Sequence, residues 1–174
     1  IPKDFPLTAY SLTGYSGGGK KLIAEYEDEN RDVRHESHRI YGTNLKHKHL
    51  PEMKTVCGLD KEPVFSPILG DFYKGMATTI LLPGFNAEEV HKVLADHYAG
   101  QELVSVAPLG GDESVIYAST LAGKDCLRII VCGREDQTTV TAMFDNLGKG
   151  ASGAAVQNMN IMLGFEAVTG LNAE

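Results

Sequence analysis

Short apolar runs recur along the chain, and the one over residues 138–144 alternates in part with polar residues. Runs of about four to eight such residues, bounded by glycine, proline or asparagine, are typical of β-strands. The first run covers residues 7–11 and precedes a turn expected at Thr13-Gly14. The other runs that predict strands cover residues 63–69, 76–82, 103–106, 127–132 and 138–144.

Apolar positions at helical spacing predict helices over residues 20–27, 50–56 and 86–99. The last of these has the clearest ends, because Asn86 is suited to cap it, Glu89 follows three residues later and Gly100 ends it. Pro51 suits the first turn of the middle helix. Residues 28–39 are dense in charge and histidine, which predicts an exposed loop.

The strands are joined through loops, with helices between some of them, and not in regular strand–helix–strand alternation. This order predicts an α+β fold with a mixed, largely antiparallel sheet and helices on one face, in a single domain over residues 1–174. Residues 148–165 are apolar on almost every side. That pattern predicts a helix that is either buried in the core or packed against another domain or subunit.

The chain has 174 residues, 43% of them hydrophobic and 22% charged, which is typical of a globular protein. A net charge of −7 argues against binding to nucleic acid, and no apolar run approaches the roughly 20 residues of a membrane span. Three cysteines, Cys57, Cys126 and Cys132, predict no disulfide framework and favour the reducing cytoplasm. The chain begins at Ile1 without a methionine, so we expect it to be part of a longer protein.

A glycine-rich segment, residues 14–21, nearly matches a nucleotide-binding phosphate loop and lies between a predicted strand and a predicted helix. The match fails at Lys21, where the motif requires a hydroxyl group to hold Mg²⁺. A tight turn that uses glycine for its conformational freedom explains the segment more simply. An intermediate interpretation also stays open, in which backbone N–H groups bind a phosphate or carboxylate of a small substrate.

A second candidate is the run His47-Lys48-His49-Leu50-Pro51-Glu52. Metal binding is disfavoured because Pro51 interrupts the strand that His-x-His-x-x-Glu would need. The nearby pair His35 and His38 is one residue short of a zinc-binding helix motif. The alternatives are a solvated histidine cluster, or a histidine at the start of a helix with Glu52 orienting it for acid–base chemistry.

Residues 145–158 form the most unusual segment, because they contain many small residues around Lys149. Small residues permit close approach of a flat cofactor, and a helix N-terminus beside a lysine offers an anion site. A tightly packed interface helix explains the same composition.

Taken together, these blocks resemble the N-acetyl-gamma-glutamyl-phosphate reductase family, in particular its shorter type. The blocks occur in family order and read GYSGGGKKLIAEYE, HKHLPEM, GDFYKGM and DNLGKGASGAAVQNMNIMLGF. The resemblance implies the C-terminal domain fold of glyceraldehyde-3-phosphate dehydrogenase-like enzymes. It also implies reduction of an acyl phosphate to a semialdehyde with NADP(H), in cytoplasmic arginine biosynthesis.

The dinucleotide loop and the nucleophilic cysteine motif of that family have no counterpart in this sequence. The resemblance therefore implies the C-terminal substrate-binding and dimerisation part, inactive alone, with NADP(H) bound mainly by an N-terminal domain toward which residues 148–165 would pack. A homo-oligomer, dimer or tetramer, is expected. The alternatives are a non-catalytic association domain and a phosphate-loop nucleotide-binding protein.

Residue by residue, the resemblance implies His49 as the catalytic histidine and no metal site. The residues it implies for substrate binding are Ser16, Gly17, Gly18, His47 and Glu52. The residues it implies for cofactor binding are Asn146, Lys149 and Gly150.

Overall fold

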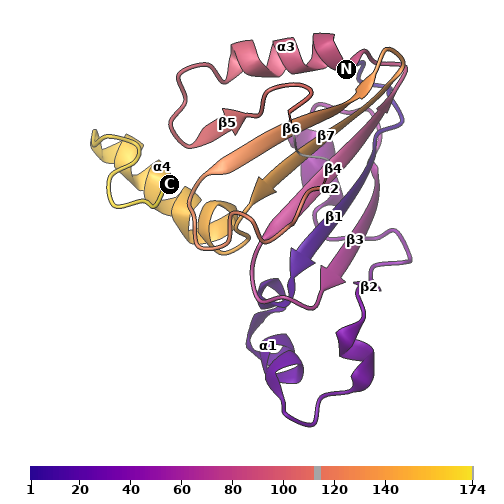
Figure 1. The fold of residues 1–174 in the computed structure, drawn as a ribbon, viewed down its shortest axis with the longest axis vertical. Helices are drawn as coiled ribbons and strands as arrows, with labels where there is room; N and C mark the ends of the chain where they lie inside the picture. Colours follow the sequence, from indigo (N-terminus) through magenta and orange to yellow (C-terminus); the bar gives the residue numbers. More distant parts are fainter. Residues whose placement is uncertain (112–114, 174) are drawn as a thin grey trace.

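A computed structural model describes residues 1–111 and 115–173 (Figure 1). In chain order its elements are β1 (Thr8–Gly14), the 3-10 turn η1 (Tyr15–Gly18), α1 (Gly19–Glu27), the 3-10 turn η2 (Val33–Glu36), β2 (Arg39–Ile40), α2 (Leu50–Val56), β3 (Val64–Gly70), β4 (Met76–Pro83), α3 (Ala87–His97), β5 (Val104–Val106), β6 (Leu127–Arg134), β7 (Gln137–Phe144), the π-helical turn η3 (Gly148–Ser152) and α4 (Gly153–Leu163). No helix of the described residues is long and apolar enough to cross a membrane.

The strands form one sheet in the order β2-β3-β1-β4-β7-β6-β5. β1 is parallel to β3 and β5 is parallel to β6, whereas the other pairings are antiparallel. The predicted α+β class with a mixed, largely antiparallel sheet is confirmed. β3 and β4 follow one another in sequence but are not neighbours, because β1 lies between them.

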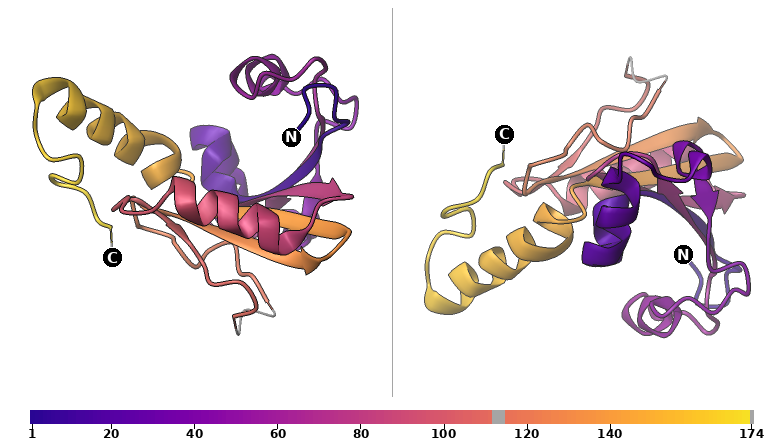
Figure 2. Two further views of the ribbon diagram at one scale, coloured as in Figure 1. Left: turned by 90° about the horizontal axis from the view of Figure 1, so that it is seen from above. Right: turned by 90° about the horizontal axis from the view of Figure 1, so that it is seen from below.

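α2 and α3 cover one face of the sheet. Leu50 of α2 packs with Ala9 and Phe65, and Val90 of α3 packs beside Ile129. On the opposite face, the described segments on either side of residues 112–114 pack over part of the sheet. Ala107, Ala118 and Leu121 join Ala77, Ile130 and Met143 there. Figure 2 shows α2 on one side of the sheet and α4 extending past the sheet.

Most elements lie where the residue pattern predicts them. α2 has the predicted bounds, and α3 begins after Asn86, whose Oδ1 accepts from the N–H groups of Glu88 and Glu89 at 2.9 and 3.1 Å. The turn predicted at Thr13-Gly14 is wrong, because β1 continues through Gly14 and pairs there with β3. The predicted exposed loop at residues 28–39 contains η2 and the first residue of β2, an edge strand.

Residues 148–165 were predicted to form a helix that is either buried in the core or packed against another domain or subunit. α4 does not lie in the core of the described chain, so the buried-helix interpretation is wrong. Its side chains are largely exposed, including Met159 at 50%, Ile161 at 58% and Met162 at 84%. Packing of this helix against another domain or subunit stays a prediction.

Strand direction brings distant segments together. β1, β3 and β7 run in the same direction, and β4 runs antiparallel to β1 and β7. The carboxyl ends of β1, β3 and β7 and the start of β4 therefore meet at one end of the sheet. In this register Gly14 lies opposite Gly70, and Met76 lies opposite both Thr13 and Phe144. The segments that follow these strands therefore converge at one place.

Candidate functional site

A cavity of about 380 Å³ lies at this end of the sheet, on the face that carries α2. Its lining consists of Ser11, Thr13, Gly17, Gly18, Tyr41, His47, Lys48, His49, Met53, Phe65, Pro67, Leu69, Met76, Thr78 and Asn146. Larger hollows border Gly133 near the other end of the sheet, but no histidine or lysine is among their described lining residues. The glycine-rich turn, the histidine motif and Asn146 thus reach the same cavity.

His49 is positioned by the start of α2. It is the residue before the helix, and Pro51 lies in the first turn. Its Nδ1 lies 3.0 Å from Oε2 of Glu52, and both side chains are well exposed, 49% and 68%. When a neutral His49 donates from Nδ1 to Glu52, Nε2 remains as its basic nitrogen. This geometry supplies the orienting carboxylate that acid–base chemistry requires.

His47 forms part of the cavity wall. Its ring centroid lies 5.2 Å from that of Phe65 and 5.3 Å from that of His49. Burial, together with the charges of His49 and Lys48, lowers the pKa of His47 below its ordinary value of 6.5. His47 is therefore held neutral, and its Nδ1 accepts from the backbone N–H of His49 at 3.4 Å.

The glycine-rich turn is attached to the loop between β3 and β4. The N–H groups of Gly14, Tyr15 and Ser16 donate to the carbonyls of Gly75, Phe72 and Tyr73 at 3.0, 2.9 and 3.0 Å. These three donors are therefore unavailable to an anion, which removes part of the predicted anion site. A Cβ on Gly14 would lie 2.5 Å from the Tyr73 carbonyl oxygen, so the close approach of the two backbones requires glycine.

The segment after β7 divides into two parts. Asn146 lines the cavity and its Nδ2 donates to the hydroxyl of Ser16, which is buried and does not line the cavity. Lys149 and Gly150 do not line the cavity. The Lys149 Nζ donates to Gln157 Oε1 at 2.5 Å, and the Gly150 N–H donates to the carbonyl of Asp145 at 2.8 Å. Burial lowers the pKa of Lys149.

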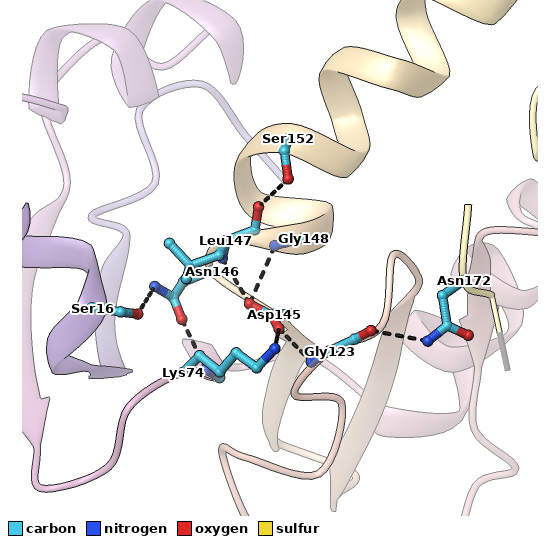
Figure 3. Close-up of polar contacts among 10 residues, drawn as sticks. Ser16, Lys74, Gly123, Asp145, Asn146, Leu147, Gly148, Ser152 and Asn172 are labelled. Carbon is cyan, nitrogen blue, oxygen red and sulfur yellow. Dashed lines mark hydrogen bonds and ion pairs between the residues drawn. The ribbon is translucent and has the colours of Figure 1, made fainter. Parts of the chain in front are cut away.

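Asp145 anchors this segment from within. It is 1% exposed, and its carboxylate accepts from the N–H groups of Gly123, Leu147 and Gly148, with Lys74 Nζ at 3.7 Å (Figure 3). Burial alone would raise the pKa of Asp145, but the three N–H donors and Lys74 outweigh it and hold the pKa below 3.8. Asp145 is therefore a buried carboxylate that stays charged.

Sequence reasoning did not select several polar residues of the cavity. Lys48 lies between the two chosen histidines and is exposed at the lining. Ser11 and Thr78, whose hydroxyl oxygens are 2.8 Å apart, lie on neighbouring strands. Lys48 could have been found from its place in the histidine motif, whereas nothing local distinguishes the two hydroxyls. Among the described residues, no group of three or more His, Cys, Asp or Glu side chains is placed to hold a metal ion.

Residues 1–146 match the family described as semialdehyde dehydrogenase, dimerisation domain. The chain belongs to this family. It is 46% identical, over 94% of its length, to proteins named N-acetyl-gamma-glutamyl-phosphate reductase from Sinorhizobium fredii and from Brucella ovis. The match covers 56% of each relative, so the chain spans about half the length of these proteins.

Solved structures support the fold. An aspartate semialdehyde dehydrogenase II from Vibrio cholerae matches with a TM-score of 0.61 and 17% identity, over 90% of this chain and 54% of that one. A probable aspartate-semialdehyde dehydrogenase from Pseudomonas aeruginosa matches with a TM-score of 0.67 and 16% identity over the same shares. At this identity the likeness concerns the fold alone.

Proposed function

We propose that this chain is the C-terminal substrate-binding and dimerisation part of an N-acetyl-gamma-glutamyl-phosphate reductase. The overall reaction is reduction of N-acetylglutamyl 5-phosphate by NADPH and a proton, giving N-acetylglutamate 5-semialdehyde, phosphate and NADP⁺. The observation that carries the proposal is the His49–Glu52 pair at a cavity that also holds the glycine-rich turn. The names of relatives at 46% identity support it.

The charge of the cavity suits such a substrate, which carries a carboxylate and an acyl phosphate. None of the described lining residues is acidic, and Lys48 contributes a basic side chain beside His47 and His49. A cleft lined by one sign of charge raises the local concentration of the opposite ion. The cavity therefore favours an anionic substrate over a neutral one.

His49 is the proposed acid–base group. Attack on an acyl phosphate by a thiol requires removal of the thiol proton, and a proton is needed again where charge develops on the carbonyl oxygen. An imidazole titrates near neutral pH and serves both steps, while Glu52 holds the ring in one orientation. The thiol is proposed to come from outside this chain, since Cys57, Cys126 and Cys132 are all absent from the cavity lining.

NADP(H) is proposed to bind mainly to a segment outside these residues. Asn146 and Lys149 already form hydrogen bonds within the chain but keep further donor hydrogens, whereas the single backbone donor of Gly150 is engaged by Asp145. The cofactor contacts that the family resemblance implies for these three residues stay a prediction.

Association through the sheet is the second part of the proposal. The face opposite α2 carries no helix among the described residues, and Tyr10 and Val64 are 40% and 53% exposed there. A hollow of about 130 Å³, lined in part by Tyr10 and Thr141, lies on this surface. The part of this sheet face that the described segments leave uncovered suits a homodimer, and membership of a dimerisation-domain family supports it.

Substitution of His49 in the complete enzyme tests the catalytic proposal. His49→Asn keeps a hydrogen-bonding tip but cannot carry a proton near neutral pH, so kcat should fall by roughly 10²–10⁴-fold with little change in stability. His47→Asn should cost less, and His38→Asn, outside the cavity, should retain full activity. Near-normal kcat in the His49→Asn enzyme would refute the assignment.

A further inference from the structure

A pair of hydroxyl groups lies on the cavity floor, the part of the lining that comes from the sheet. Ser11 and Thr78 face each other across β1 and β4, and their hydroxyl oxygens are 2.8 Å apart. Both residues line the cavity, and Ser11 is only 1% exposed. Neither residue takes part in the acid–base chemistry proposed for His49.

The pair holds one more donor hydrogen than it can use internally. Two hydroxyl groups carry two such hydrogens, and the bond between them engages one. Among the residues that the structure describes, neither hydroxyl has another hydrogen-bond partner. The neighbours across the strands are Pro67 beside Ser11 and Ala142 beside Thr78, and their side chains have no acceptor atom. One hydroxyl hydrogen can therefore bind an oxygen atom of a ligand in the cavity.

The surroundings of the pair favour a neutral ligand group over an ion. The floor beside it is apolar, with Phe65 and Pro67 on the neighbouring strand β3. An ion without a charged partner is costly to bury at such a place, whereas an amide carbonyl needs only a hydrogen bond. The basic side chains of the lining, His47, Lys48 and His49, come from the segment before α2 instead. The cavity thus has a basic part and a neutral polar part.

The substrate of the proposed reaction is divided in the same way. N-acetylglutamyl 5-phosphate carries two anionic groups, a carboxylate and an acyl phosphate, and one neutral amide, the acetamido group. The acetyl carbonyl can accept the remaining hydroxyl hydrogen, and the amide N–H can donate to a hydroxyl oxygen. The methyl group suits the apolar floor. An analogue without the acetamido group would leave the hydroxyl hydrogen unpaired at a buried position, and a site of this kind discriminates strongly against such an analogue.

We propose that Ser11 and Thr78 form the subsite for the acetamido group and thereby make the enzyme selective for the N-acetylated substrate. This assignment rests on the proposed reductase function, because only that function supplies an acetamido group. The family resemblance implies an acetylated substrate but no residue that recognises the acetyl group. The hydroxyl pair on β1 and β4 supplies that recognition.

The test compares two aldehydes in the reverse reaction of the complete enzyme, in which NADP⁺ and phosphate convert the semialdehyde to the acyl phosphate. N-acetylglutamate 5-semialdehyde has the acetamido group, and glutarate semialdehyde has the same aldehyde and carboxylate but lacks it. The wild type should prefer the acetylated aldehyde roughly ten- to a thousandfold in kcat/KM. Ser11→Ala and Thr78→Val should each lower kcat/KM for that aldehyde roughly five- to fiftyfold and change the value for glutarate semialdehyde by less than about threefold.

Two control variants separate recognition from general damage. Thr78→Ser keeps the hydroxyl group and should keep the preference for the acetylated aldehyde. Ser105→Ala removes an exposed hydroxyl on the edge strand β5 and should leave both values of kcat/KM unchanged. Thr78→Val preserves the shape of the side chain, so it decides the outcome if Ser11→Ala does not fold.

Equal losses with both aldehydes would show a purely structural role and overturn the proposal. An unchanged preference in Ser11→Ala and Thr78→Val would overturn it too, as would a wild type that converts both aldehydes equally well. A wild type that does not convert N-acetylglutamate 5-semialdehyde would instead refute the proposed function, and the subsite with it.

Discussion

Replacement of Asp145 by asparagine should destabilise the protein more than any surface substitution. Asp145 Oδ1 accepts from the N–H groups of Leu147 and Gly148 at 2.7 and 3.2 Å, and Oδ2 accepts from Gly123 and lies 3.7 Å from Lys74 Nζ. Asparagine has the same shape but replaces one acceptor oxygen with an NH₂ group. Whichever way the amide is turned, its NH₂ group faces backbone N–H donors.

The expected magnitude follows from these contacts. Where the NH₂ group of the asparagine replaces an oxygen, either the N–H of Gly123 or the N–H groups of Leu147 and Gly148 would lose their acceptor. The hydrogen bonds that remain would be to a neutral amide oxygen and no longer to a charged carboxylate. Hydrogen bonds to charged groups contribute about 1.5–3 kcal/mol each, and a buried donor left without an acceptor costs about 1–3 kcal/mol. Lys74 is 38% exposed and can regain water, so its share is small. We expect Asp145→Asn to lower the free energy of unfolding by about 3–5 kcal/mol.

Urea denaturation followed by circular dichroism measures this difference, and Asp136→Asn is the matched control. The Asp136 side chain is 71% exposed and has one 3.4 Å ion pair with Arg134, so its replacement should change stability by less than about 0.5 kcal/mol. Equal stability of the two variants would refute the role assigned to the Asp145 carboxylate.

The pH dependence gives a second check. The pKa of Asp145 in the folded protein lies below 3.8, so its contribution is complete above that pH and is lost as the pH falls through the folded pKa. The gap in stability between wild type and Asp145→Asn should therefore narrow in acid. A gap that stays constant in acid would show that the carboxylate charge is not the cause.

Three further outcomes are expected. Because the pKa of His47 is lowered in the folded protein, the unfolded chain binds a proton more readily as the pH falls below about 6.5, and the free energy of unfolding should decrease there. His47→Asn should make this decrease smaller in denaturation curves measured at several pH values. The same pH dependence in the variant and the wild type would contradict this expectation. Gly14→Ala should lower the melting temperature, because its Cβ would force the Tyr73 carbonyl away. Gly17→Ala should fold normally and weaken substrate binding, because its Cβ would meet its nearest neighbour, Asn146 Nδ2, only at 3.5 Å. Equal melting temperatures for the two variants would be inconsistent with this packing. Tyr10→Glu should shift the complete enzyme toward monomer in sedimentation velocity, and an unchanged oligomer would exclude this sheet face as the interface.

Local chemistry was sufficient to predict several elements and one part of the site. α2 and α3 were predicted because Pro51, Asn86 and Gly100 act on their own neighbours. The His49–Glu52 pair was predictable for the same reason, since residues three apart at the start of a helix are neighbours in space. These features depend only on interactions within about one helical turn.

Tertiary structure alone decided the strand order and the surroundings of Asn146. A residue pattern identifies β1, β3 and β7 as strands but does not show that their carboxyl ends meet, because pairing partners are far apart in sequence. The contact between Ser16 and Asn146 depends on that meeting. The sequence alone thus identified the candidate site residues, and the arrangement of the sheet decided which of them share a cavity.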